Sequence, residues 1–151
     1  MAIALAIHIL SAIIWVGGMF FAYVCLRPVA SSLLETPQRL PLLSGVLKRF
    51  FRWVWVAIIL LLTTGFWMGF GLFKALSNWP LYVQLMMGLG IFMALLFVYL
   101  FFVPYQRLTK VLAKNNLKEA GCQFGRIQLI VAINLILGFL VSIIASAGRY
   151  L

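Results

Sequence analysis

Four long apolar stretches without a charged residue most constrain what this chain can fold into. They cover residues 2–25, 53–73, 81–103 and 127–147, and none contains Asp, Glu, Lys or Arg. A membrane-spanning helix needs about 20 mostly apolar residues to cross a hydrocarbon core of about 30 Å. Because backbone groups in lipid must find hydrogen bonds within their own segment, each stretch is predicted to be a helix.

The composition excludes a water-soluble domain. Of 151 residues, 66% are apolar and only 9% are charged, whereas soluble domains carry roughly 25% charged residues. A chain of this length has too much surface to hide so much apolar material from water. We therefore predict an all-α fold, a single-domain integral membrane protein that forms an antiparallel four-helix bundle in the lipid bilayer.

Prolines and polar residues mark the expected ends of the spans. Arg27-Pro28 is expected to close the first helix and Pro104 the third, because proline disfavours helical geometry in the residue before it. Residues 77–80 form a predicted tight turn between the second and third spans. On the basic side, apolar residues recur at helical spacing over 40–50, which predicts a short amphipathic helix along the membrane surface.

The basic residues predict the orientation of the bundle. Of the twelve Lys and Arg residues, ten flank the two long loops and two lie at the opposite ends of the spans. Cytoplasmic loops carry an excess of Lys and Arg, so we expect both loops in the cytoplasm and both termini outside, on the periplasmic side of a bacterial inner membrane. The ten are Arg27, Arg39, Lys48, Arg49, Arg52, Arg107, Lys110, Lys114, Lys118 and Arg126; the two are Lys74 and Arg149.

Two function classes are disfavoured by the charges. The net charge of +10 does not indicate nucleic-acid binding, because the basic residues flank spans and form no patch interleaved with aromatic residues. The predicted spans contain no side chains suited to hydrolysis or to phosphate chemistry. The chain has no aspartate and no phosphate loop, and both glutamates, Glu35 and Glu119, lie in the loops. A non-enzymatic role is therefore favoured.

Several polar and soft side chains lie at similar depth in the outer half of the predicted bundle. An imidazole with thioether sulfurs is a soft ligand set, suited to Cu(I) or to haem iron. Counted from the outer end of each helix, the residues about one to two turns in are His8, Met68, Gln84, Met86, Met87 and Ser142. The candidate copper ligands are His8, Met68, Met86 and Met87. The candidate axial ligands of a haem b are His8 with Met86 or Met87. Plain packing also accounts for these residues, because methionine is a common apolar filler.

Other residues are expected to hold the bundle together. Asn134 is expected to hydrogen-bond across helices, and small residues let helices approach closely. The spacing Gly65-x-x-x-Gly69 is typical of helix contacts, and it is compatible with a homo-oligomer or a membrane partner. The expected packing residues also include Trp15, Gly17, Gly18, Gly88 and Gly138.

The first span resembles the first helix of the copper resistance protein D (CopD) family. The shared features are His8, then Trp15 and the pair Gly17-Gly18 in the same register. Further segments that look similar to small members of that family are 49–65, 103–105 and 133–150. The resemblance implies a bacterial inner-membrane protein associated with copper handling, by import or resistance.

The same helix is also similar to the HemJ-type protoporphyrinogen oxidases, small four-helix membrane proteins that bind haem b. In that family the first-helix histidine pairs functionally with a lysine early in the third helix. This chain keeps the histidine as His8 but has Gln84 where the lysine would fall. Three functions therefore stay open: copper handling through His8, haem-based redox chemistry, and a structural or accessory subunit without chemistry.

Overall fold

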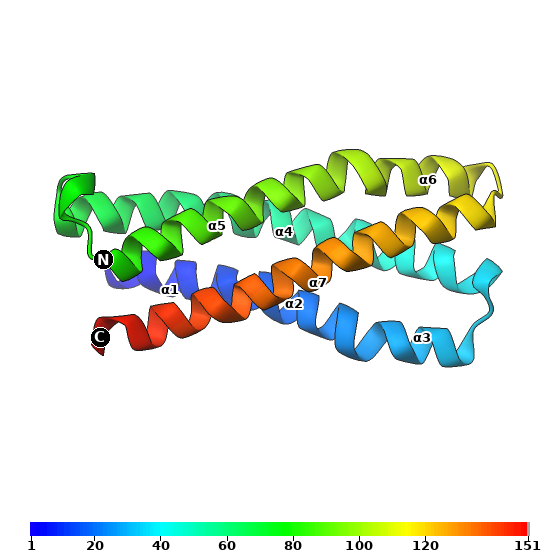
Figure 1. Ribbon diagram of the computed structural model, residues 1–151, viewed down its shortest axis with the longest axis horizontal. Coiled ribbons are helices and arrows are strands. Elements are labelled where there is room, and N and C mark those ends of the chain that lie inside the picture. The colour runs from blue at the N-terminus through cyan, green and yellow to red at the C-terminus, as the bar shows by residue number, and fades with distance from the viewer. Residues whose placement is uncertain (151) are drawn as a thin grey trace.

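The computed structural model describes residues 1–150 as an antiparallel bundle of four long helical rods. The rods Ala2–Leu33, Thr36–Phe73, Leu81–Ala113 and Leu117–Ala147 are all long and apolar enough to cross a membrane. Both chain ends and the turn between the second and third rods lie at one end of the bundle, and the other two connections lie at the opposite end (Figure 1). The predicted all-α, four-span fold is confirmed.

Two of the rods, the first and the third, consist of shorter helical segments. The first contains α1 (Ala2–Ala12), η1 (Ile13–Gly17), α2 (Gly18–Phe20), η2 (Phe21–Leu26) and α3 (Arg27–Leu33). The second is one helix, α4 (Thr36–Phe73), and the 3₁₀ turn η3 (Leu76–Asn78) follows it. The third contains α5 (Leu81–Leu100), η4 (Phe101–Tyr105) and α6 (Gln106–Ala113), and the fourth is α7 (Leu117–Ala147) with η5 (Gly148–Tyr150) after it.

Two predicted helix ends were wrong, because the prolines do not stop the rods. Pro28 lies in the first turn of α3, directly after the π-helical turn η2, and Pro104 lies inside the π-helical turn η4. Proline lacks the N–H of the regular helical hydrogen bond. A wider π turn changes the bonding pattern locally, so the chain continues as a helix through both sites.

The predicted amphipathic helix on the membrane surface was also wrong. Its residues are the beginning of α4, which runs without a break for 38 residues. Such a helix is roughly 57 Å long, so it projects well beyond a hydrocarbon core of about 30 Å. Leu40, Leu43 and Leu47 are buried inside the bundle, so the four-helix packing extends into the basic end.

Aromatic rings fill the centre of the bundle. Trp15 is 4% exposed and packs edge-on against Phe97, with ring centroids 6.4 Å apart. Phe51 packs edge-on against both Phe97 and Tyr105, at 5.3 and 4.9 Å. Between helices in lipid, such close packing replaces the hydrophobic effect as a driving force. The predicted packing role of Trp15 agrees with this core.

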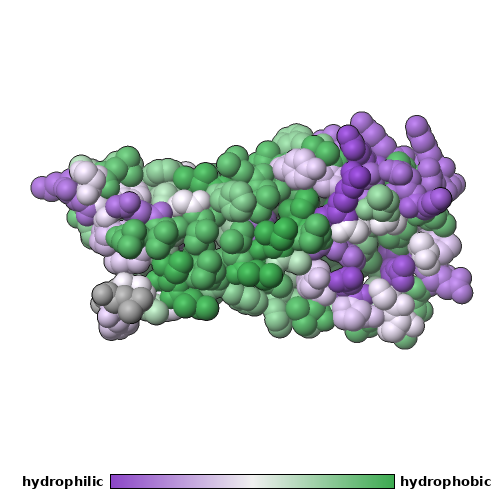
Figure 2. Space-filling model, viewed as in Figure 1, coloured by the Kyte–Doolittle hydropathy of each residue, from purple (hydrophilic) through white to green (hydrophobic). Residues whose placement is uncertain are grey.

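The outer surface has the polarity of a membrane protein. On the face shown in Figure 2, apolar side chains cover the middle of the molecule, and hydrophilic side chains gather at the end formed by α3 and α6. Many large apolar side chains point outward, among them Trp67, which is 72% exposed. Lipid is the solvent that suits such a surface.

The glycines divide into two groups. A Cβ added at Gly18 would meet the ring of Phe50, one at Gly69 would meet the indole of Trp79, and one at Gly138 would lie 2.8 Å from Val16. These three glycines permit close approach, as expected. A fourth predicted glycine, Gly65, also has side chains against it, whereas Gly17 and Gly88 face open space, with no atom within 4 Å of an added Cβ. Within the described chain, no helix packs closely against these two glycines.

Candidate functional site

His8 on α1 contacts α4 through a direct hydrogen bond. Its ring Nδ1 lies 2.9 Å from the hydroxyl oxygen of Thr64. Thr64 is buried, 9% exposed, while His8 is half-buried. The two residues lie 56 positions apart in the chain, so the antiparallel pairing of the first two rods brings them together.

The second hydrogen bond of Thr64 determines which ring nitrogen of His8 is available. The Thr64 hydroxyl donates its only hydrogen to the carbonyl of Leu60, one turn earlier on α4. Its oxygen therefore accepts from His8, which places the ring proton on Nδ1. In neutral imidazole the other nitrogen, Nε2, then carries the free lone pair. Metal-binding histidines commonly donate their second ring N–H to such an anchor.

Gly65 follows Thr64 on α4 and, because it has no side chain, leaves room beside the His8–Thr64 pair. The atoms nearest to an added Gly65 Cβ are His8 Cε1 at 3.3 Å, the Met87 methyl carbon at 3.7 Å and His8 Nδ1 at 3.8 Å. The imidazole from α1 and the end of the Met87 side chain from α5 therefore both approach the bare backbone of α4 at Gly65. This is the point where the structure brings together two of the predicted ligand residues.

The other predicted residues at this depth have different surroundings. Met68 and Met86 are half-buried, and neither is among the atoms nearest to Gly65. The side-chain amide of Gln84 donates to the carbonyl of Trp79 at 2.8 Å, so it bonds the start of α5 to the preceding turn. Ser142 is exposed and donates back to Gly138 on its own helix, at 2.8 Å.

Trp79 packs over α4 one turn beyond the His8 contact, toward the end that carries both termini. Its indole lies against Gly69 and its ring is 5.4 Å from that of Phe70. The residue is 3% exposed. Gly65 and Gly69 are thus both covered by side chains of the same chain, Gly65 by His8 and Met87 and Gly69 by Trp79.

Asn134 lies elsewhere in the bundle, on the middle of α7. Its side-chain nitrogen donates to the carbonyl of Met93 on α5 at 3.3 Å, which is the predicted bond across helices. The Asn134 side chain is 2% exposed, and among the described residues its oxygen has no hydrogen-bond partner. Its contact is with α5, so it belongs to the packing between α5 and α7.

The donor set at His8 fits a soft monovalent metal. Among residues 1–150 no group of three or more His, Cys, Asp or Glu side chains could hold a metal ion. A metal held here would instead use the imidazole nitrogen of His8 and the thioether of Met87, from helices that are distant in sequence. That combination suits Cu(I) rather than hard cations, which prefer oxygen ligands.

Thr64 is the hydrogen-bond partner of His8 that the sequence analysis did not single out. A threonine in a membrane helix can bond to its own backbone, and Thr63 and Thr64 both do so. Thr63 is exposed, whereas Thr64 is buried against His8. The sequence did contain one signal for Thr64, its depth in the membrane. Thr64 directly precedes Gly65, on the same stretch of α4 that also carries the candidate ligand Met68.

Comparison with models of known protein families places the chain beside a family linked to copper. The family model described as copper resistance protein D matches residues 44–147. The matched region covers most of α4 and all of α5, α6 and α7, while α1 with His8 lies before it. A relation to the HemJ-type oxidases is not among the findings. No curated protein and no solved structure matches the chain.

Proposed function

This chain belongs to the copper resistance protein D family, and on that premise we propose that it handles copper by binding Cu(I) between His8 and Met87. The family is linked to copper resistance, and the chain is a multi-pass membrane protein. We further propose that the membrane is a bacterial inner membrane, with the His8 end toward the periplasm.

One observation carries the proposal. Thr64 accepts the Nδ1 proton of His8, so the lone pair of Nε2 is available to a metal. Met87 supplies a thioether beside the same ring. Copper is the ion that the protein would bind or pass on. His8 and Met87 would hold it, and Thr64 would orient the imidazole.

Titration of the purified protein with Cu(I), against a competing colorimetric chelator under reducing conditions, tests the proposal. We expect one Cu(I) per chain for the wild type, no binding for His8→Ala and clearly weaker binding for Met87→Leu. Met86→Leu is the matched control, because Met86 is the neighbouring half-buried methionine on α5 and is not among the three nearest neighbours of an added Gly65 Cβ.

Two outcomes would contradict the proposal. The first is unchanged copper stoichiometry in His8→Ala, once membrane insertion of the variant has been verified. The second is an intense Soret absorption band of the purified protein that is lost in His8→Ala, because it would make His8 a haem ligand.

A further inference from the structure

We infer that the basic end of the bundle holds a specific site for an anionic phospholipid, with the lipid phosphate between Arg27 and Arg39. A cavity of about 220 Å³ lies there, between α3, the beginning of α4 and the beginning of α7. Its polar lining includes the two arginines, Ser31, Thr36 and Gln128. This site is separate from His8, which lies toward the opposite end.

The burial of the basic residues distinguishes the two arginines from the rest. Arg27 and Arg39 are half-buried, and both line this cavity. Among the other Lys and Arg residues whose side chains the structure describes, every one is exposed. Exposed cations at a membrane surface need no ligand, whereas two half-buried ones that share a cavity favour an anion between them.

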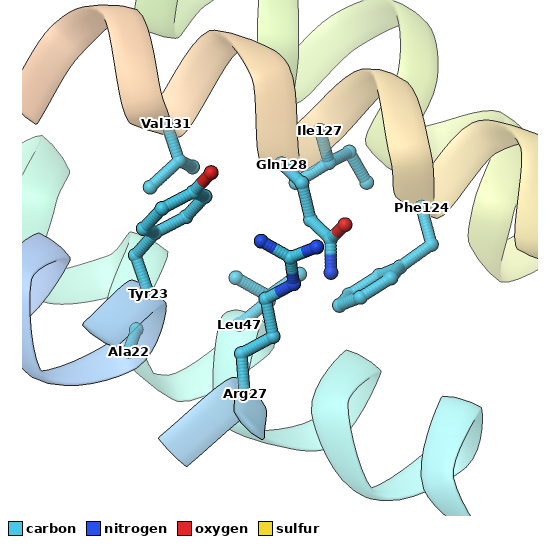
Figure 3. Close-up of a pocket in the computed structure, with 8 residues that line it drawn as sticks. All are labelled: Ala22, Tyr23, Arg27, Leu47, Phe124, Ile127, Gln128 and Val131. Atoms are coloured by element: carbon cyan, nitrogen blue, oxygen red, sulfur yellow. The ribbon is translucent and has the colours of Figure 1, made fainter. Parts of the chain in front are cut away.

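Neither arginine has an ion-pair partner among the described residues. The chain has only two acidic residues, and the Arg27 guanidinium lies over the face of Tyr23, 5.0 Å from the ring centroid. Figure 3 shows the Arg27 guanidinium pointing between Tyr23 and Gln128, with the amide of Gln128 beside it. These N–H donors match the oxygens of a phosphate group.

Two glycines on α7 leave the cavity open. Gly121 and Gly125 lie one turn apart and both line it. An added Cβ at either would meet no atom within 4 Å. Glycines at this spacing usually let two helices touch, but here they leave room for a ligand.

A second, apolar crevice extends from the cavity toward the membrane interior. It has a volume of about 40 Å³ and shares Arg27, Phe124 and Gln128 with the larger cavity. Its apolar lining residues are Ala22, Tyr23, Leu47, Ile127 and Val131 (Figure 3). On the first two rods these residues lie closer to the centre of the bundle than the polar lining residues do, and on α7 Val131 does so.

This gradient from polar to apolar fits an amphiphile better than free phosphate. At about 1.5 Å per residue, Arg27 lies roughly 37 Å along the first rod from Ala2. That distance is just past a hydrocarbon core of about 30 Å, at the level of the lipid headgroups. The headgroup phosphate would lie between the arginines, and an acyl chain would follow the apolar crevice. Basic pockets between membrane helices are known to bind anionic headgroups in this way.

Thermal unfolding of the delipidated protein in detergent tests the inference. The added probes are dioleoyl phosphatidylglycerol, dioleoyl phosphatidylcholine and inorganic phosphate. We expect phosphatidylglycerol to raise the unfolding temperature, and the other two to have little effect. In the double variant Arg27→Gln/Arg39→Gln, the apparent affinity for phosphatidylglycerol should fall by at least about tenfold. The matched control is Arg49→Gln/Arg52→Gln, which removes the same charge from exposed positions and should respond like the wild type.

A cavity-filling variant, Gly125→Leu, tests the site without changing the charge. Its side chain would enter the open space, and the response to phosphatidylglycerol should be lost although both arginines remain. An equal response to phosphatidylcholine, or an equal effect of inorganic phosphate, would overturn the assignment to an anionic lipid. Equal losses in the Arg49→Gln/Arg52→Gln control would also overturn it, because they would show general charge attraction.

Discussion

The Nδ1 atom of His8 and the hydroxyl of Thr64 lie 2.9 Å apart and join the first two rods. The same hydroxyl donates to Leu60, so the interaction has a defined direction, with His8 as donor. For the proposed Cu(I) site, this relationship would make Thr64 a positioning residue, because its hydroxyl holds the proton of His8 on Nδ1.

The first prediction concerns Thr64→Val. Valine has nearly the same shape but no hydroxyl, so the ring of His8 loses its acceptor and both tautomers become accessible. We expect the Cu(I) affinity to fall by about 10- to 100-fold, with the four-helix fold retained. Competition titration with a Cu(I) chelator measures the change.

Two further variants separate this effect from general damage. Thr64→Ser keeps the hydroxyl and should restore most of the affinity. Thr63→Val removes the neighbouring hydroxyl, which is exposed and bonds only within α4, so it should leave affinity unchanged. Equal affinity of Thr64→Val and wild type would refute the positioning role.

The second prediction concerns Gly65→Ala. The new methyl group would lie 3.3 Å from His8 Cε1, tighter than ordinary van der Waals contact, so the imidazole must move by a few tenths of an ångström. We expect weaker Cu(I) binding and a modest fall in thermal stability. Gly88→Ala on α5 is the control, because its methyl group would meet nothing within 4 Å and should change neither quantity. A Gly65→Ala protein with wild-type copper affinity would place the site elsewhere.

The spans could be predicted because apolar length alone decides them, but the helix ends could not. At Pro28 and Pro104 the sequence signal for a helix end was present, yet π-helical turns accommodate both prolines. The candidate site was likewise predictable only in part. His8 was identifiable as the only histidine, whereas depth along a helix does not give rotation about its axis. Only the packed bundle distinguishes Met87 from Met86, one residue apart, and shows that Thr64 faces His8.

The third prediction concerns Asn134→Leu. The substitution removes one 3.3 Å hydrogen bond to Met93 but also removes a buried oxygen that has no partner among the described residues. Hydrogen bonds between membrane helices contribute only about 0.6 kcal/mol on average. We therefore expect the free energy of unfolding to change by less than about 1 kcal/mol, measured by titration with a denaturing detergent in mixed micelles.

A core aromatic gives the comparison for Asn134. Phe97 packs against Trp15, Phe51 and Trp55, so Phe97→Ala leaves a large cavity and should cost about 3 kcal/mol or more. Comparable losses in Asn134→Leu and Phe97→Ala would mean that the bond from α7 to α5 is a main support of the bundle.

The last prediction concerns orientation in the membrane. Most basic residues lie at the end formed by α3 and α6, so that end should face the cytoplasm. In a background without Cys25 and Cys122, Asn78→Cys in the turn before α5 should react with a membrane-impermeant thiol reagent added to intact cells. Lys114→Cys should react only after the cells are opened. Lys114 is preferred over its neighbour Asn115, whose φ of 53° makes substitution strained. The reverse labelling pattern would put His8 on the cytoplasmic side and contradict a periplasmic copper site, while leaving the fold unchanged.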